Sequence, residues 1–181
     1  MTEGWTHDKS SALWEEQDES EKEKWPEPFF HDLKLEPIEQ IGKTCVPTSL
    51  AVVARGTGAD VGPDDFKHTI NTQSPHTWST ALAPFGMQLA YCSHDARFLE
   101  CYIEELIEYD DLFLLCFYAE NKLREKPEGG VFGGSHVVTL YRDRIIDTND
   151  DKSVEALKYR RRKSRTKRIF RVIPKGHPRC V

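Results

Sequence analysis

The sequence predicts a single α+β domain in which helices precede most of an antiparallel sheet. Apolar residues recur at helical spacing in the first half of the chain, whereas short apolar runs of strand length dominate the second half. Helices followed by strands are typical of the α+β class. The chain has 181 residues, 38% of them hydrophobic, which suits the core of one domain better than two.

The first helix is expected over residues 44–56. Thr44 or Cys45 provides a polar entry, Pro47 is tolerated in the first turn, and Gly56 suits a left-handed stop. Cys45 would then lie at a helix N-terminus. Two shorter helices are expected, one after Pro63 to about residue 71 and one over 77–85 before Gly86.

The remaining elements alternate between strand and helix patterns. A short strand is expected over Met87–Cys92, and an amphipathic surface helix over 95–109. The continuous apolar run Leu112–Tyr118 is typical of a strand buried on both faces. Further strands are expected over Ser135–Tyr141, over Arg144–Asp147 after a tight turn, and over Arg168–Ile173.

The net charge of −5 hides a strong segregation along the chain. Residues 1–30 carry −6, residues 31–151 carry −10, and residues 152–181 carry +11. Residues 1–32 could be a loose acidic arm or a short helix that docks Trp14 and Trp25, and we expect a partly ordered arm. A folded domain is expected over 33–151, and a basic segment over 152–181 with a last strand.

The sequence also excludes several classes of protein. No apolar run approaches the roughly 18–20 residues that span a bilayer, and the N-terminus does not read as a signal peptide, so a cytoplasmic protein is expected. Secretion by a signal-independent route stays open. Five irregularly spaced cysteines predict free thiols, and neither zinc-type ligand pairs nor phosphate-binding glycine loops are present, so no metal or cofactor is expected.

Four residues form a possible thiol-based catalytic site. Cys45 at a helix N-terminus gains thiolate character, and His136 follows two glycines at the start of a strand, where a substrate could approach it. A hairpin that turns at residues 142–143 would place Asp147 beside His136 to orient the imidazole. Gln40, five residues before Cys45, could stabilise an oxyanion together with the Cys45 N–H.

Each of these residues also has a structural interpretation. Free cysteines are usually buried small hydrophobes, which is the interpretation we keep for Cys92, Cys101 and Cys116, and Cys180 is expected to be exposed near the chain end. His136, Asp147 and Gln40 could likewise be ordinary strand, hairpin or surface residues. The order Gln, Cys, His, Asp on matching elements favours catalysis.

Over residues 36–150 the chain resembles the papain-like cysteine peptidases, and most of all the peptidases that process bacteriocin leaders, with their stand-alone relatives. The likeness rests on Gln40, on Cys-Val-Pro-Thr-Ser-Leu-Ala from Cys45, on His136-Val-Val and on Ile-Ile-Asp147. It implies a nucleophile at Cys45, a base at His136, an orienting Asp147 and an oxyanion donor at Gln40.

The chain departs from that family pattern at two positions. Val46 replaces the usual glycine after the nucleophile, and Thr148 replaces the usual proline after Asp147. Asn149 could orient the histidine instead if the register shifts by two residues. Since no transporter portion follows in the sequence, a leader-exporting transporter is not implied.

The expected function is a cysteine-dependent hydrolase that cuts a peptide or isopeptide bond through an acyl-thioester, with deployment as an effector or toxin as an analogy from the fold. A glutamine deamidase of a target protein would use the same steps. A third alternative is a non-catalytic papain-like module whose basic stretch Lys158–Arg168 binds nucleic acid or an acidic protein. That stretch could also be a solvated charged loop, or a strand that pairs with the acidic arm of the same molecule.

Overall fold

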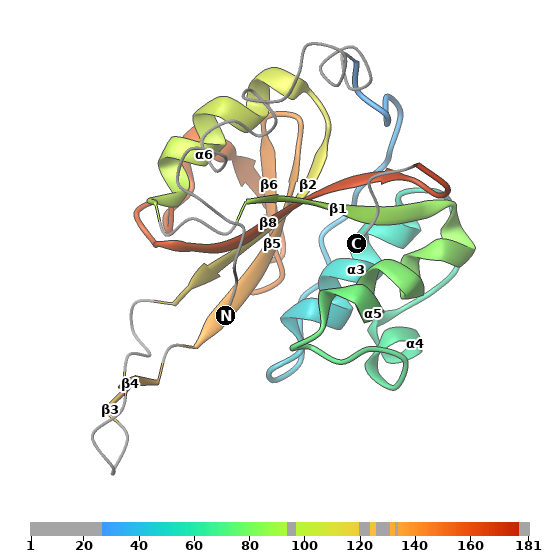
Figure 1. Cartoon of the computed structure of the whole chain (residues 1–181), viewed down its shortest axis with the longest axis horizontal. Coiled ribbons are helices and arrows are strands. Elements are labelled where there is room, and N and C mark those ends of the chain that lie inside the picture. Colours follow the sequence, from blue (N-terminus) through green and yellow to red (C-terminus); the bar gives the residue numbers. More distant parts are fainter. Residues whose placement is uncertain (1–26, 94–96, 120–123, 126–130, 133, 178–181) are drawn as a thin grey trace.

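The structure, a computed structural model, describes residues 27–93, 97–119, 124–125, 131–132 and 134–177. In this described part of the chain, three helices come first and lie together on one side of the molecule (Figure 1). A 3₁₀ turn follows them and ends at Gly86, whose φ of 75° is the left-handed conformation that glycine adopts without a clash. These elements are α3 (Cys45–Arg55), α4 (Pro63–Lys67), α5 (Pro75–Leu82) and η1 (Ala83–Phe85).

The second half of the chain builds a six-stranded sheet in the order β1-β8-β2-β5-β6-β7, with every neighbouring pair antiparallel. This arrangement confirms the α+β prediction. Its strands are β1 (Met87–Ser93), β2 (Leu112–Tyr118), β5 (Ser135–Tyr141), β6 (Arg144–Asp147), β7 (Ser153–Glu155) and β8 (Thr166–Pro174). The other elements are α6 (Leu99–Leu106), η2 (Ile107–Tyr109), η4 (Ala156–Lys158), and a separate pair of β3 (Arg124–Glu125) and β4 (Val131–Phe132).

Two hydrophobic clusters lie on the two faces of the sheet, and β2 contributes to both. Its alternate residues Phe113 and Leu115 pack with α6, whereas Leu114 and Cys116 pack with α3 and α5. This double burial is what the continuous apolar run predicts. The sheet therefore forms the wall between two packed layers.

Two helices begin or end at different residues from those predicted. Helix α4 ends at Lys67 rather than near residue 71. Helix α6 begins at Leu99 because Phe98 is extended, with ψ of 139°, and forms a β-bridge with Arg165; residues 94–96 lie outside the described part. The end of α4 and the start of α6 could not be predicted from the spacing of apolar residues alone.

Gly56 has a different role from the predicted left-handed stop. Its φ is −57°, and the left-handed residue after α3 is Gly58 with φ of 91°. A Cβ on Gly56 would lie 2.4 Å from Leu35 Cδ2 and 3.1 Å from the Val53 carbonyl oxygen. Glycine is needed here because the segment before α3 passes close to the end of that helix.

The basic C-terminal segment is part of the sheet rather than an appendage to it. Strand β8 lies between β1 and β2 and buries Ile169, Phe170 and Val172. The boundary predicted at residue 151 therefore does not end the packed sheet. The charge pattern alone does not predict that β8 is a central strand, because Lys and Arg residues are clustered before it.

The packed body also starts earlier than residue 33. Phe29 and Phe30 each donate a backbone N–H to Asp111, at 3.1 Å, and the same carboxylate forms a fully buried ion pair with Arg171 at 2.7 Å. The Phe29 ring lies 4.8 Å from the Arg171 guanidinium. Trp14 and Trp25, with the acidic arm to residue 26, lie outside the described residues.

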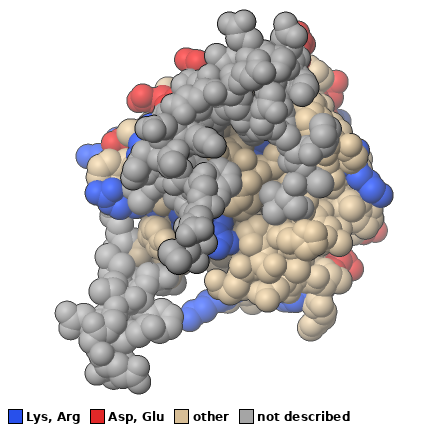
Figure 2. All heavy atoms as spheres, viewed as in Figure 1, with Lys and Arg blue, Asp and Glu red and all other residues tan. Residues whose placement is uncertain are grey.

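Charge is distributed unevenly over the surface. In the face shown by Figure 2, basic side chains are visible at the left edge and centre, and acidic ones mainly along the upper edge. Three basic residues that follow β7 pair with carboxylates of the molecule itself: Lys158 with Glu155, Arg160 with Asp150, and Arg162 with Glu100. Among the described residues, no helix is long and apolar enough to cross a membrane.

Candidate active site

Cys45 is the first residue of α3 and is half-buried beside the end of β5. Burial raises the pKa of its thiol, but the hydrogen bond and charge of His136 lower it, and the backbone N–H groups of Val137 and Val46 lower it further. The net pKa lies below the ordinary thiol value. The thiolate is therefore favoured at this position, as a nucleophile requires.

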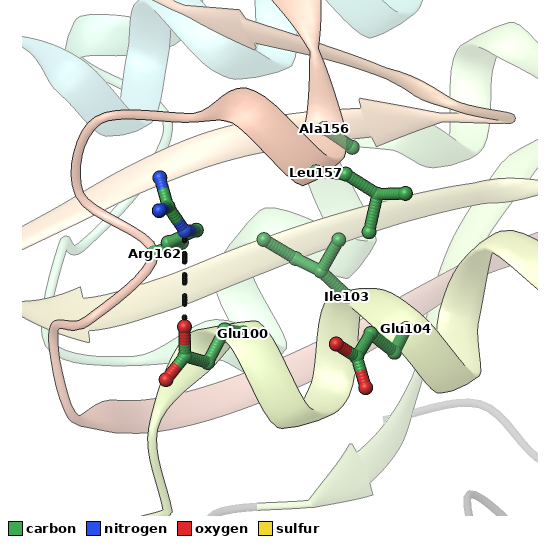
Figure 3. A pocket seen from close by; sticks show the side chains of 6 residues that line it. All are labelled: Glu100, Ile103, Glu104, Ala156, Leu157 and Arg162. Carbon is green, nitrogen blue, oxygen red and sulfur yellow. Dashed lines mark ion pairs between the residues drawn. The ribbon is translucent and has the colours of Figure 1, made fainter.

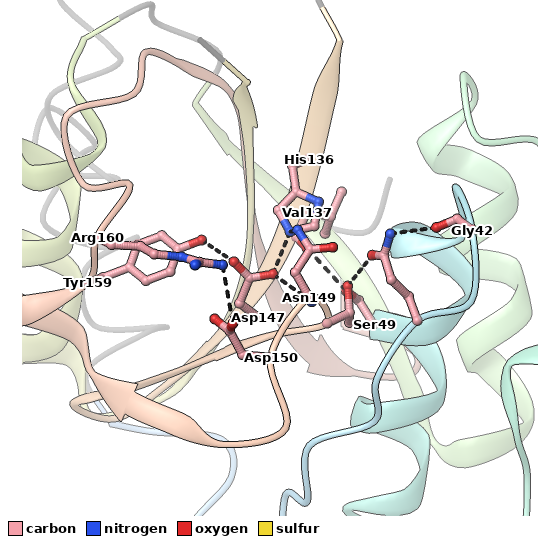
Figure 4. A network of polar contacts seen from close by, with 11 residues as sticks. Gly42, Ser49, His136, Val137, Asp147, Asn149, Asp150, Tyr159 and Arg160 are labelled. Carbon is pink, nitrogen blue, oxygen red and sulfur yellow. Dashed lines mark hydrogen bonds and ion pairs between the residues drawn. The ribbon is translucent and has the colours of Figure 1, made fainter. Parts of the chain in front are cut away.

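His136 and Asp147 meet across the β5–β6 hairpin. Val138 pairs with Asp147 in the sheet, which is the register predicted from the turn at residues 142–143. Imidazole Nε2 lies 2.6 Å from Asp147 Oδ1, and both side chains are buried (Figure 4). The hairpin thus brings an imidazole and a carboxylate into contact.

The ionisation of this pair follows from its contacts. Burial lowers the pKa of His136, but its bonds to Asp147 and Cys45 outweigh this and raise the pKa to about 9. Burial raises the pKa of Asp147, but His136, the Tyr159 hydroxyl and the Asn149 N–H lower it to about 2. At neutral pH the site therefore favours a thiolate, an imidazolium and a carboxylate.

Two groups approach the same imidazole nitrogen. Asp147 Oδ1 lies 2.6 Å from His136 Nε2, whereas the Asn149 side-chain nitrogen lies 3.3 Å from it. The shorter, charge-assisted contact is the stronger one, so the geometry favours Asp147 as the orienting group. Asn149 instead donates its backbone N–H to Asp147 at 3.0 Å. Nδ1 is then the ring nitrogen left for Cys45.

Sequence reasoning missed the two aromatic residues that hold this pair. The Tyr159 hydroxyl donates to Asp147 Oδ2 at 2.6 Å, and its ring packs against Phe117, 6.3 Å between centroids. Phe117 in turn contacts the His136 ring edge-on at 5.6 Å. No motif reveals Tyr159, because it lies between basic residues in a turn whose path depends on the whole sheet.

Gln40 lies next to the hairpin through a different set of contacts. Its backbone N–H donates to the Thr148 carbonyl at 2.7 Å, and its side-chain oxygen accepts from the Thr148 hydroxyl. Its side-chain nitrogen donates to the Gly42 carbonyl at 2.7 Å, which leaves the second amide hydrogen for another acceptor. Thr148, a departure from the family pattern, thus anchors Gln40 to β6.

The other described cysteines have different surroundings. Cys92 and Cys116 are buried, and burial raises the pKa of both thiols, that of Cys116 to about 12. Cys101 is exposed on α6, contrary to the buried position expected from its apolar pattern. Cys180 lies outside the described residues. Cys45 is the one described thiol in contact with a histidine that can act as its base.

A surface hollow elsewhere does not belong to this site. It lies between α6 and the turn after β7, where the Glu100–Arg162 ion pair, 3.7 Å long, crosses it (Figure 3). Neither Cys45 nor His136 lines it. Its lining residues are Glu100, Ile103, Glu104, Ala156, Leu157 and Arg162.

A helix that begins at a cysteine and packs on an antiparallel sheet that carries histidine and aspartate defines a papain-like fold. More particularly, the chain is similar to a double glycine motif protease from an AMS/PCAT transporter, solved in complex with the leader peptide (TM-score 0.52, 15% identity, 81% of this chain and 96% of that chain).

A second solved structure gives a similar result. It is the peptidase domain of Streptococcus ComA, a bifunctional ABC transporter involved in a quorum-sensing pathway (TM-score 0.50, 15% identity, 78% of this chain and 100% of that chain). No family model matches the sequence, and no curated protein matches it. The likeness to these two peptidase domains concerns the fold, as expected from the sequence resemblance.

Proposed function

We propose that this protein is a cysteine peptidase with Cys45 as its nucleophile. The observation that carries the proposal is the chain of contacts from Cys45 through His136 to Asp147, built from α3, β5 and β6. The shared fold with two peptidase domains supports it. Cys, His and Asp in this arrangement provide a nucleophile, a base and an orienting group.

The reaction follows from the protonation states. Cys45 Sγ attacks the substrate carbonyl carbon, and the oxyanion is stabilised by the Cys45 N–H and the Gln40 amide. The His136 imidazolium donates its proton to the leaving amine as the C–N bond breaks, which leaves an acyl-thioester. Water then attacks the thioester, His136 accepts its proton, and the thiolate departs with release of the carboxylic acid.

A peptide is the substrate that the comparison supports, since one structural neighbour is solved with a leader peptide bound. Isopeptide cleavage and glutamine deamidation use the same carbonyl chemistry and differ in the leaving group. Hydrolysis of a peptide or isopeptide bond frees an amine that stays on a polypeptide, whereas deamidation releases ammonia. The product thus distinguishes deamidation from the two cleavage reactions, and the substrate that is cut distinguishes those two from each other.

The test is cleavage of blocked peptides with a central Gly-Gly, of an isopeptide-linked pair and of a glutamine peptide, with product masses and ammonia both measured. We expect new peptide termini from the native enzyme and from Cys101→Ala, and none from Cys45→Ala. Ammonia release without cleavage would support the deamidase instead. Equal modification of Cys45 and Cys101 by iodoacetamide in the native protein would contradict a thiol enzyme altogether.

The basic stretch 158–168 supports a separate binding function less well. Three of its cations already pair with Glu155, Asp150 and Glu100 of the folded body. The partner that the sequence suggested, the acidic arm, lies outside the described residues up to residue 26. Binding to nucleic acid or an acidic protein, a cytoplasmic location and use as an effector all stay predictions from sequence.

A further inference from the structure

Two cations of strand β8, Lys167 and Arg168, differ from Lys158, Arg160 and Arg162 in the preceding turn. Both are half-buried, and in the described part of the chain neither forms an ion pair. A half-buried cation loses hydration and normally gains a carboxylate in return. The neighbouring Lys158, Arg160 and Arg162 have such partners, so the absence of one at these two positions requires a different explanation.

Strand pairing places Arg168 on the same face of the sheet as the nucleophile. Cys116 pairs with Val137 on one side and with Arg168 on the other, so the three residues form a row across β5, β2 and β8. Directly paired residues point to the same face. Val137 lies under Cys45, whose thiol it contacts through a backbone hydrogen bond. Arg168 is thus about 10 Å from Val137, two strand spacings across the sheet.

Lys167 belongs to the same region. The register shifts between Cys116 and Phe117, and the Lys167 ammonium lies 5.9 Å from the centre of the Tyr118 ring. Tyr118 is exposed and pairs with Ser135, the residue before His136. The charge of both cations reaches the Cys116 thiol, which also experiences that of Cys45. Both cations are therefore close enough to meet a peptide that reacts at Cys45.

We infer that Lys167 and Arg168 form a subsite for an acidic side chain of the substrate, two to three residues from the scissile bond. The inference rests on the proposed peptidase function and adds a substrate preference to it. Each extended residue spans about 3.3–3.6 Å, so two to three residues cover the two strand spacings. The carboxylate would supply the missing counter-charge, and Tyr118 an apolar wall beside it.

The test uses electrophiles that report on Cys45 without a known substrate. A series of chloroacetyl-(Gly)n-Glu amides, with n from 0 to 2, is compared with the matching Gln amides, and the rate of Cys45 modification is measured by mass spectrometry. The Glu reagent should react about fivefold faster than the Gln reagent at n of 1 or 2, with less preference at n of 0. Exposed Cys101 serves as the internal reference.

Substitution of the two cations and addition of salt test whether the preference for Glu over Gln depends on Lys167 and Arg168. In Lys167→Gln/Arg168→Gln the Glu preference should fall to about one. The control Lys152→Gln/Lys163→Gln, which removes the same two charges from exposed residues, should retain it. In the native protein 0.5 M NaCl should reduce the preference, and this arm stands even if the double variant fails to fold.

The two proposals fail in different ways. Equal rates for Glu and Gln reagents at every length, or a preference that survives in the folded double variant, would overturn the subsite while Cys45 remains reactive. If Cys45 reacts no faster than Cys101 with chloroacetamide itself, the peptidase proposal fails instead.

Discussion

The imidazole of His136 is held from three directions, by charge, by a hydrogen bond and by an aromatic wall. Asp147 Oδ1 lies 2.6 Å from Nε2, Cys45 hydrogen-bonds to the imidazole, and Phe117 packs edge-on at 5.6 Å. Each contact limits ring rotation, which preserves the alignment that proton transfer needs. Tyr159 extends the arrangement by one step because it fixes the second oxygen of Asp147.

Tyr159→Phe tests that last step at the scale of one atom. The variant keeps the ring against Phe117 but leaves a buried Asp147 oxygen without its donor, so we expect a loss of about 1–3 kcal/mol in the free energy of unfolding, measured in urea. The exposed Tyr118→Phe should change little. Identical stability of Tyr159→Phe and the native protein would show that the hydroxyl does not support the carboxylate.

At this scale the sequence predicts the residues proposed to react but not those that support them. Cys45, His136 and Asp147 can be predicted because helix start, strand start and hairpin register are local properties. Tyr159 cannot, since its partner is twelve residues away across a turn without a pattern. Residue spacing likewise cannot show that Asn149 lies farther than Asp147 from the His136 nitrogen, because this depends on interatomic distances.

At the scale of elements, strand β8 has a more central place in the sheet than its charged sequence suggests. It pairs with β1 along one edge and with β2 along the other, and it buries residues of both hydrophobic clusters. The apolar run of β2 can be predicted as a central strand, and it is confirmed as one. The central place of β8 depends on long-range pairing, which local alternation does not specify.

Truncation after residue 151 should therefore unfold the protein rather than release an independent tail. The shortened chain lacks β7 and β8, so β1 and β2 would each lose a neighbour and expose apolar faces. We expect no cooperative transition in urea when the truncated chain is followed by circular dichroism. A truncated chain that unfolds cooperatively and still shows a fast-reacting Cys45 would contradict the central role of β8.

At the scale of the whole molecule, one buried ion pair links three distant segments. Asp111 before β2 bonds Arg171 in β8 at 2.7 Å and accepts the backbone N–H groups of Phe29 and Phe30. The guanidinium also lies under the rings of Phe29, Tyr109 and Phe113. The pair fixes the path of the segment that leads toward Gln40 and α3, so it indirectly positions the site.

Asp111→Asn should destabilise the fold by about 3 to 5 kcal/mol, because it leaves Arg171 charged and without its counter-ion in a dry environment. The neighbouring Asp110→Asn removes only an exposed pair with Arg142 and should have little effect. Thermal or urea unfolding measures both variants. Comparable losses for the two would show that burial of the Asp111 pair is unimportant.

The proposed peptidase function requires that Cys45 on α3 and His136 on β5 ionise together as a thiolate–imidazolium pair. Alkylation of Cys45 by iodoacetamide as a function of pH tests this most directly, in the native protein and in His136→Ala. Below about pH 9 the imidazolium should stabilise the thiolate, so the native midpoint should lie below the usual thiol range.

In His136→Ala the hydrogen bond and charge of the imidazolium are lost, while burial and the backbone hydrogen bonds of Val137 and Val46 remain. The pKa of Cys45 should therefore rise, and the alkylation rate at pH 7 should fall about tenfold for each unit of that rise. Cys101 should be alkylated at the same rate in both proteins. A Cys45 midpoint in the usual thiol range that does not move in His136→Ala would contradict the thiolate–imidazolium pair and, with it, the proposed peptidase.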